Sequence, residues 1–466
     1  MKKLLLISGV LITLLLVLGV IGLRFMGISV TDPGPILRTG TALAAKLACS
    51  AHHLTGMPEK AASEEIYSYV PLGDWLRVDY RRDNRLVAAT LMRTSTKTAT
   101  YRPGLGCTIN NGDTSAVDAL VVAPLPAEVT APWPAGNMVD SINPGMQTLA
   151  DSILQRDNAA GYNTRAIAVV HQGKLVAEAY ADGFNSESQL MGWSMGKSLT
   201  STMLGHLAYR GQLDVNENNL FADWQNDQRA TITLQNMLQM TSGLDFNEAY
   251  VAGSDATRML FTANSSAAVA LASPAAHMPG QHFAYSSGTT NALMQWLSNR
   301  LGGHQALLDF LVQRIYQPLH LHHTTFEVDP SGLPVGSSYL YASARDWARM
   351  GQLWLNRGTL NGSRLLSEAW VDAATQPNPS ENFQAYGYQF WLNRGNGDLR
   401  WPELPADTYA MTGNRQQSVA IIPSRQVVLV RLGWTAGRYP MTTNYRTLLD
   451  GLAGHAGLDS PADVAN

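Results

Sequence analysis

The chain has 466 residues, of which 45% are hydrophobic and 15% are charged, which is typical of globular protein and enough for two or three domains. Its formal net charge of -3 excludes the basic footprint of a nucleic-acid-binding protein. Its two cysteines, without clustered histidines, exclude a conventional structural zinc site.

The first feature along the chain is an unbroken apolar run over residues 4–23, preceded by two lysines and followed by Arg24. About 20 apolar residues can span a membrane once, and the lysines favour a cytoplasmic N-terminus. No small-residue cleavage site follows the run. We therefore expect an uncleaved anchor over residues 1–28 in the inner (cytoplasmic) membrane, with the rest of the chain periplasmic. The alternative is a cleaved signal peptide, which implies the same compartment.

Residues 29–123 are expected to form a small module that contains β-strands. Strand-like stretches separated by turn residues cover 75–80, 86–92 and 98–102. In an oxidising compartment, Cys49 and Cys107 favour one disulfide that closes this module, and two buried free thiols are the alternative.

Residues 124–144 contain five prolines and are typical of a semi-rigid linker, which places a domain boundary before residues 145–466. The larger domain begins with a helical pattern and a hairpin, continues with mostly helical sequence and ends with two strands and a helix. These elements cover 145–158, 166–171, 174–181, 194–211, 234–240, 267–271, 290–301, 342–356, 418–422, 427–432 and 443–451. Strands at both ends predict an α/β (α+β) fold: one antiparallel sheet built from both ends, flanked by helices, with a mostly helical insertion that creates a cleft.

Ser194 and Lys197 form an S-x-x-K motif at the start of a helix-like stretch. At this spacing the two side chains lie on one face of a helix, within reach of each other. A serine hydroxyl is a weak nucleophile, and a desolvated neutral lysine can take its proton. The motif alone is a weak signal, because a serine in this position is more often a helix cap.

Further short motifs raise its significance. They follow one another as 194–197 (SMGK), 240–244 (MTSGL), 279–280 (PG), 285–288 (YSSG) and 386–391 (YGYQFW). Together they resemble the class C β-lactamase and DD-peptidase family of penicillin-recognising serine hydrolases, over roughly residues 140–455. Within that family, Cys49 and the runs 101–107 and 246–250 resemble the aminohexanoate-oligomer (nylon-oligomer) hydrolase branch.

The resemblance implies catalytic roles for three residues. Ser194 matches the acylated nucleophile, Lys197 the lysine that shares its proton, and Tyr285 the tyrosine that protonates the leaving group and activates water. Packing as an ordinary aromatic is the alternative for Tyr285. Ser287 stands where the family has asparagine and lacks the bifunctional amide, which favours an ester or linear amide over a β-lactam as substrate.

The third family motif, a K-T-G-like triplet, is degenerate. Thr412 and Gly413 resemble its core, with Met411 where a cation is usual; an alternative register places the family's following glycines at Gly413 and Asn414. In either register we expect a backbone N–H within 413–416 to pair with that of Ser194 as an oxyanion hole.

Four further substrate-side predictions follow from the resemblance. Arg415 would replace the missing cation and bind a substrate carboxylate, or would be a solvated strand charge. Gln416 belongs to the same candidate loop. Tyr250 and Asp255 match substrate-side positions of the nylon-oligomer branch.

A rival interpretation uses the same serine. Residues 192–196 also satisfy G-x-S-x-G, the nucleophile elbow of α/β-hydrolases, and His455 could complete a triad. The elbow requires a buried strand before the serine, whereas residues 185–191 are polar. Three histidines at 320, 322 and 323 have no carboxylate at ligand spacing, so we expect no metal site.

We therefore predict a membrane-anchored serine hydrolase that acts through an acyl-enzyme on an ester or amide, without metal or organic cofactor and without a nucleic-acid partner. Two alternatives remain. One is a catalytically silent member of the fold that binds peptidoglycan or a peptide. The other is a tethered scaffold whose N-terminal module binds a protein partner.

Overall fold

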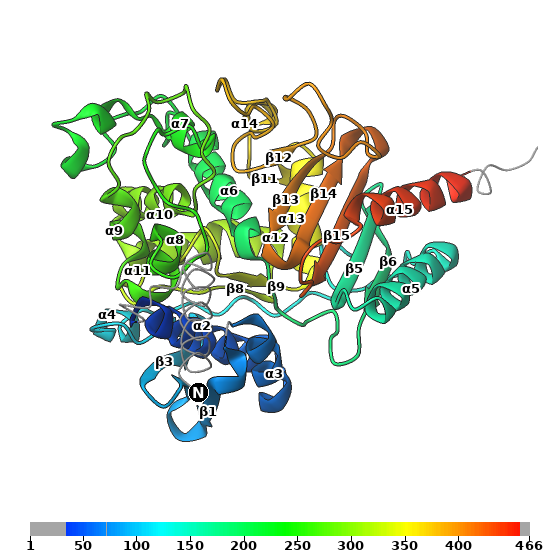
Figure 1. Cartoon of the computed structure of the whole chain (residues 1–466). Helices are drawn as coiled ribbons and strands as arrows, with labels where there is room; N and C mark the ends of the chain where they lie inside the picture. The colour runs from blue at the N-terminus through cyan, green and yellow to red at the C-terminus, as the bar shows by residue number, and fades with distance from the viewer. Residues whose placement is uncertain (1–33, 71, 457–466) are drawn as a thin grey trace, which may run out of the picture.

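The computed structural model describes residues 34–70 and 72–456, and at its centre is a six-stranded antiparallel sheet (Figure 1). In spatial order the strands are β12 (Trp391–Leu392), β13 (Tyr409–Gly413), β14 (Gln417–Ile422), β15 (Val427–Gly433), β5 (Thr164–His171) and β6 (Lys174–Tyr180). Strand β15 pairs along its length with β5, so the sheet joins the two ends of the larger domain. This confirms the predicted fold class.

Helices cover both faces of this sheet. Helices α5 (Pro144–Ala159) and α15 (Met441–Ala456) pack together on one face, and α13 (Ala344–Leu355) packs on the other. Strands β14 and β15 are consequently buried at every residue. A strand covered on both faces is a continuous apolar run rather than an alternating one, which made these two strands recognisable in the sequence.

The insertion between β6 and β12 is mostly helical, as predicted. Its longer helices are α6 (Gly196–Tyr209), α9 (Ser266–Leu271), α10 (Ser287–Leu301), α11 (His304–Phe310) and α14 (Glu368–Ala374), and its shorter ones are α7 (Leu234–Leu238), α8 (Asp255–Thr257) and α12 (Gln317–Leu319). It also holds a three-stranded sheet of β7 (Leu190–Met191), β9 (Leu340–Ala342) and β8 (Thr324–Phe326), and a hairpin of β10 (Thr359–Leu360) and β11 (Ser363–Arg364). Helix α10 begins earlier than predicted because the Ser286 side chain caps it by accepting the N–H of Thr289.

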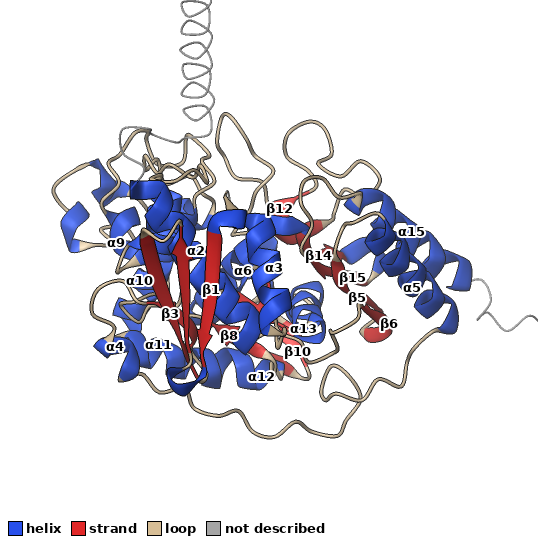
Figure 2. Ribbon diagram, turned by 60° about the horizontal axis from the view of Figure 1, so that its bottom comes forward, coloured by secondary structure: helices blue, strands red, loops and turns tan. Residues whose placement is uncertain are grey.

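The N-terminal part contains a second antiparallel sheet (Figure 2). Its strands are β1 (Leu76–Arg81), β2 (Leu86–Leu91), β3 (Ser95–Arg102) and β4 (Gly106–Ile109), accompanied by helices α2 (Gly34–His53), α3 (Glu59–Tyr69) and α4 (Ser115–Asp118). Helix α2 packs on β2, β3 and β4. The predicted disulfide is confirmed: Cys49 of α2 is bonded to Cys107 of β4.

This N-terminal module shares a hydrophobic core with the larger domain. Apolar side chains of α2 and of the second sheet pack in one buried cluster with Trp193, Phe261 and Trp434. Lys46 of α2 also forms a fully buried ion pair with Glu327 of the larger domain. An unpaired buried charge is costly, so loss of either partner should destabilise this contact between the module and the larger domain.

The predicted linker is in contact with the protein over part of its length. Trp133 is buried, and the Arg349 guanidinium donates hydrogen bonds to the carbonyls of Pro134 (3.0 Å) and Gly136 (2.7 Å). The division into residues 29–123, 124–144 and 145–466 stays a prediction.

The predicted membrane location requires correction. The expected anchor, residues 1–28, lies outside the described residues. Within 34–70 and 72–456, no helix combines the length and the apolar composition needed to cross a bilayer. Helix α2 has 20 residues, but it is a mixed alanine and threonine helix that carries Lys46. This finding contradicts the single-pass inner-membrane prediction, which is withdrawn.

Candidate active site

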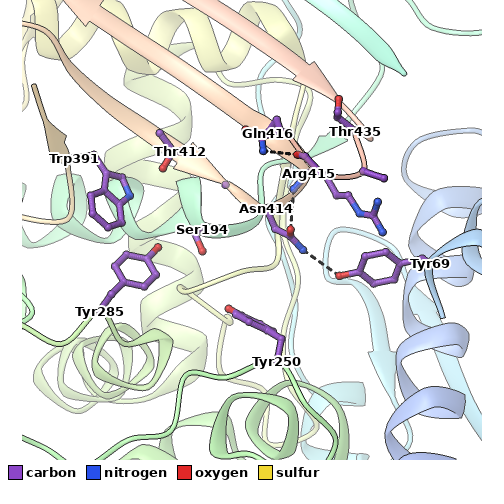
Figure 3. A pocket seen from close by; sticks show the side chains of 13 residues that line it. Tyr69, Ser194, Tyr250, Tyr285, Trp391, Thr412, Asn414, Arg415, Gln416 and Thr435 are labelled. Carbon is purple, nitrogen blue, oxygen red and sulfur yellow. Dashed lines mark hydrogen bonds between the residues drawn. The ribbon is translucent and has the colours of Figure 1, made fainter. Parts of the chain in front are cut away.

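A cleft of about 650 Å³ lies beside the end of β13 (Figure 3). Its walls come from distant parts of the sequence: Tyr69, Ser194, Tyr250, Tyr285, Trp391, residues 412–416 and residues 435–437. The fold thus brings the predicted nucleophile, the predicted tyrosine and the predicted oxyanion loop to one cavity. Tyr69 comes from the N-terminal module and was not predicted.

Ser194 lies in a single 3-10 turn, Trp193–Met195, between β7 and α6. Trp193 has a φ of 49°, a left-handed conformation that is uncommon for a bulky side chain. Its ring is buried near those of Tyr69 and Trp434. The end of β13 also packs closely against this turn. A Cβ at Gly413 would lie 2.1 Å from the Gly192 carbonyl oxygen, so only glycine allows the two backbone segments to lie this close. This packing compensates the backbone strain and directs Ser194 into the cleft.

Lys197 is 1% exposed and its amine has three oxygen partners. Its Nζ lies 3.0 Å from Ser194 Oγ, 3.1 Å from Ser287 Oγ and 3.0 Å from the Ser337 carbonyl oxygen. Burial lowers the pKa of Lys197 to about 8, against the opposing effect of the Glu248 charge. When neutral, the amine can still donate to two of these oxygens and accept the Ser194 proton with its lone pair.

Tyr285 lies on the other side of the serine. Its ring stacks on Trp391 with centroids 5.1 Å apart, and the Lys197 Nζ is 4.8 Å from its centroid. Burial is the main cause that raises the pKa of Tyr285, and the Glu248 charge also raises this pKa. The hydrogen bond with Ser194 and the Arg400 charge lower the pKa. The net effect is a rise, so the group remains a phenol at neutral pH and can donate a proton.

Glu248, which was not predicted as a site residue, is hydrogen-bonded to two residues of the site, Ser287 and Tyr250. Its carboxylate accepts the Ser287 hydroxyl (2.5 Å), the Ser287 backbone N–H (2.7 Å) and the Tyr250 hydroxyl (2.9 Å). A carboxylate is favourable here because Ser287 is the first residue of α10, at the positive end of the helix. The available signal was its place in the run 246–250, next to the predicted Tyr250.

The third motif lies at the end of β13. Met411 is buried in the hydrophobic core and supplies no cation, whereas Thr412 and Gly413 line the cleft. The following turn, Asn414–Gln416, also lines it. The Asn414 side chain donates to the Tyr69 hydroxyl (3.0 Å) and accepts the Arg415 N–H (2.8 Å) (Figure 3). This placement favours the register in which Thr412 and Gly413 are the motif core.

Two arginines lie near the cleft. The predicted Arg415 has its guanidinium 4.2 Å from the Tyr69 ring centroid, and burial lowers its pKa. The Arg400 guanidinium, which was not predicted, lies 4.1 Å from the Trp391 ring centroid. Its charge lowers the pKa of Tyr285. A cation therefore stands on each side of the serine.

Asp255 is not brought to the cleft. Its carboxylate accepts the Asn247 N–H (3.0 Å) and pairs with Arg258 (3.0 Å), so it holds the local chain instead. Tyr250 does line the cleft.

The α/β-hydrolase interpretation is wrong. The strand before Ser194, β7, has two residues and belongs to a small antiparallel sheet, whereas a nucleophile elbow needs a long buried strand. The backbone of His455 lies near the end of α15, which packs on α5. Within the part of the chain that the structure describes, no group of three or more histidine, cysteine or acidic side chains is placed to hold a metal ion.

Comparisons with known proteins agree with the fold. Residues 149–450 match the family model described as beta-lactamase. A 6-aminohexanoate-dimer hydrolase of Paenarthrobacter ureafaciens is 24% identical over 258 residues, which are 51% of this chain and 64% of that protein. The match thus spans less than two thirds of that relative.

Two solved structures are similar in fold. One is a Bacillus anthracis protein provisionally assigned as a 6-aminohexanoate-dimer hydrolase, with a TM-score of 0.54 at 19% identity over 76% of this chain and 91% of that one. The other is a family VIII carboxylesterase, with a TM-score of 0.52 at 13% identity over 67% of this chain and 98% of that one.

Proposed function

Since the chain belongs to the beta-lactamase family, whose members are serine hydrolases, we propose that it hydrolyses an ester or a linear amide through a covalent acyl-enzyme on Ser194. The observation that carries the proposal is the buried Lys197 amine, 3.0 Å from the Ser194 hydroxyl and with a pKa lowered to about 8. A lysine in this state is a base of suitable strength for serine near neutral pH.

In the acylation step, Ser194 Oγ attacks the carbonyl carbon of the substrate and its proton passes to Lys197 Nζ. The oxygen of the tetrahedral intermediate carries the negative charge. The backbone N–H groups of Ser194 and Asn414 are the proposed donors to it, because both residues line the cleft and Gly413 packs against the turn that holds Ser194. Such donors contribute most when they are fixed before the reaction.

The intermediate then breaks the bond between the carbonyl carbon and the leaving oxygen or nitrogen. Tyr285 gives its proton to the leaving group, and Lys197, now protonated, returns one to Tyr285. Water next attacks the acyl carbonyl carbon and gives a proton to the neutral Lys197 amine. The bond from that carbon to Ser194 Oγ then breaks, the proton passes from Lys197 back to Ser194 Oγ, and the acid is released. The raised pKa of Tyr285 suits this role because the group stays protonated until the leaving group needs the proton.

Esters and linear amides are favoured over β-lactams by two departures from the family motifs. Ser287 replaces an asparagine, and its hydroxyl already has Lys197 and Glu248 as partners. Met411 replaces a cation and is buried. The two groups that would hold a β-lactam amide and carboxylate are therefore missing from these positions.

The direct test is mass spectrometry of the full-length chain after treatment with a fluorophosphonate probe. We expect one adduct on Ser194 in the natural protein, strongly slowed in Lys197→Ala. The matched control is Lys174→Ala, because Lys174 is an exposed lysine on β6. Absence of an adduct on folded protein would overturn the proposal in favour of a binding protein with this fold.

A further inference from the structure

A second cavity, of about 480 Å³, lies next to the cleft, between the N-terminal module and the larger domain. One wall comes from helix α2, with Ile36, Gly40 and Leu43, and the other includes Val251 and Phe261. Both cavities are lined by Tyr69 and Tyr250, and Trp193, which lines the second one, directly precedes Ser194. The second cavity is therefore adjacent to the site of acylation, with Tyr69 and Tyr250 contributing to both cavities.

The chemistry of this cavity is apolar. Among the described residues that line it none is charged, and most are aliphatic or aromatic. Two nearby acids do not line it and already have partners: Asp255 pairs with Arg258, and Glu248 accepts from Ser287 and from the Tyr250 hydroxyl. A chain that ends in an ammonium group would thus find no free carboxylate here, and burying an unpaired charge is strongly unfavourable. The cavity fits an uncharged hydrocarbon chain.

The acyl group and the leaving group of the substrate would lie on opposite sides of Ser194. Figure 3 shows Tyr285 and Trp391 on one side of Ser194 and Tyr69 on the other, with Tyr250 lower in the view and towards the Tyr69 side. Because Tyr285 is the proposed proton donor to the leaving group, the leaving group belongs on its side. The acyl chain then extends towards Tyr69 and Tyr250, where the second cavity opens.

We propose that the second cavity binds the hydrocarbon tail of the acyl group, so that the preferred substrates are esters or amides of uncharged, medium-chain acyl groups. This inference rests on the proposed function of Ser194. The mouth of the cavity supports it, since Val251 is 43% exposed and Tyr250 is 56% exposed. These two neighbouring side chains leave apolar surface accessible beside the cavity that they line.

Gly40 offers a way to fill the cavity. A Cβ there would have only ordinary contacts, 3.6 Å to Val70 and 3.7 Å to Leu91, both of which line the cavity. A leucine at this position would occupy the space of the acyl tail. In the full-length chain, Gly40→Leu should lower the ratio of kcat/KM for p-nitrophenyl octanoate to that for p-nitrophenyl acetate by about tenfold or more.

The matched control is Gly454→Leu, another helical glycine, exposed and with open space around its Cβ. It should leave the ratio unchanged. A second variant, Val251→Asp, places a carboxylate at the exposed mouth and should also lower the ratio; its control is Val129→Asp, since Val129 is 46% exposed and lines neither cavity. A ratio that stays the same in both cavity variants overturns the inference, while ester hydrolysis itself upholds the function of Ser194.

A binding experiment tests the cavity independently of turnover. Ser194→Ala should bind n-octanol in a calorimetric titration, and the double variant Ser194→Ala/Gly40→Leu should not. If the natural protein hydrolyses none of the esters, the proposed function fails, and this titration still decides on the cavity. Equal binding by the two variants, or no binding by either, overturns the inference.

Discussion

Glu248 accepts hydrogen bonds from both the hydroxyl and the backbone N–H of Ser287, at 2.5 and 2.7 Å. Ser287 Oγ in turn is a partner of the Lys197 amine at 3.1 Å. The Ser287 hydroxyl therefore connects the proposed base, Lys197, to the Glu248 carboxylate at the start of α10. Burial lowers the pKa of Lys197 and the Glu248 charge opposes this effect, which leads to the first two predictions.

The first prediction concerns the pH dependence of the natural protein. Lys197 must be neutral to accept the Ser194 proton, and its pKa is lowered to about 8. We expect kcat/KM for an activated ester to rise with pH and to level off above about pH 8, because the neutral fraction increases as protons are lost. Stopped-flow or steady-state rates across this range would show the inflection. A flat profile through this region would exclude Lys197 as the titrating base.

The second prediction concerns Glu248→Gln. The Glu248 charge raises the pKa of Lys197, so its removal should move the inflection of the pH profile to lower pH. Loss of a carboxylate at the start of α10 should also lower the free energy of unfolding by about 1 kcal/mol or less. Glu187→Gln, at an exposed position, is the control for the pH profile. An inflection that does not move would show that this carboxylate has no influence on the base.

The third prediction concerns the phenol of Tyr285. Tyr285→Phe keeps the ring that stacks on Trp391 but removes the proposed proton donor, so kcat should fall by about a hundredfold or more. The loss should be smaller for a p-nitrophenyl ester, whose leaving group needs no proton, than for an alkyl ester. Tyr209→Phe, a 41% exposed tyrosine, is the control. An equal loss for both ester types would argue that Tyr285 acts through packing instead.

The fourth prediction concerns the buried ion pair between Lys46 and Glu327. Lys46→Met leaves Glu327 without its partner and should lower the free energy of unfolding by about 3–5 kcal/mol. Lys46→Met/Glu327→Gln should recover most of this loss, because the glutamine carbonyl can still accept from the Ser50 hydroxyl and the Cys107 N–H. Urea denaturation followed by tryptophan fluorescence measures both.

The exposed pair of Lys60 and Glu64 provides the control for this experiment. Its side chains are 88% and 63% exposed, so Lys60→Met should have little effect on stability. If the Lys46→Met and Glu327→Gln effects simply add, the two groups do not act as a pair.

The fifth prediction concerns the disulfide. Cys49 and Cys107 are 58 residues apart, so the bond restricts a long loop of the unfolded chain. Cys49→Ala/Cys107→Ala should lower the free energy of unfolding by about 2–4 kcal/mol. Denaturation of the natural protein with a thiol reductant should approach the curve of the double variant. Equal stability of the oxidised protein and the double variant would refute this contribution.

Local patterns in the sequence were sufficient for much of the fold and for part of the site. Four of the six strands of the central sheet, β5, β6, β14 and β15, were predicted from their apolar patterns, whereas β12 and β13 were not. Residues 194–197 placed a serine and a lysine within reach of each other. These features depend on the spacing of neighbours along one chain, which sequence periodicity records. The number of cysteines likewise left a single intramolecular disulfide pairing.

Other features appeared only in the tertiary structure. Tyr69 lines the cleft and Arg400 lies beside it against Trp391 because separate elements pack together, and no short motif of this chain records that packing. The same holds for the second cavity, whose walls come from helix α2 and from the segment around Val251. Asp255 is the opposite case. The family resemblance predicted it on the substrate side, but in the structure it pairs with Arg258 and does not line the cleft.

The sequence by itself therefore determined the family, four strands of the central sheet and the serine–lysine pair, because these follow from local order and spacing. Only the tertiary structure decided which charged group lies near the lysine, that Tyr69 of the N-terminal module lines the cleft, and where the second cavity lies. The physical reason is that burial, pKa shifts and cavity shape depend on surfaces that meet across long sequence separations.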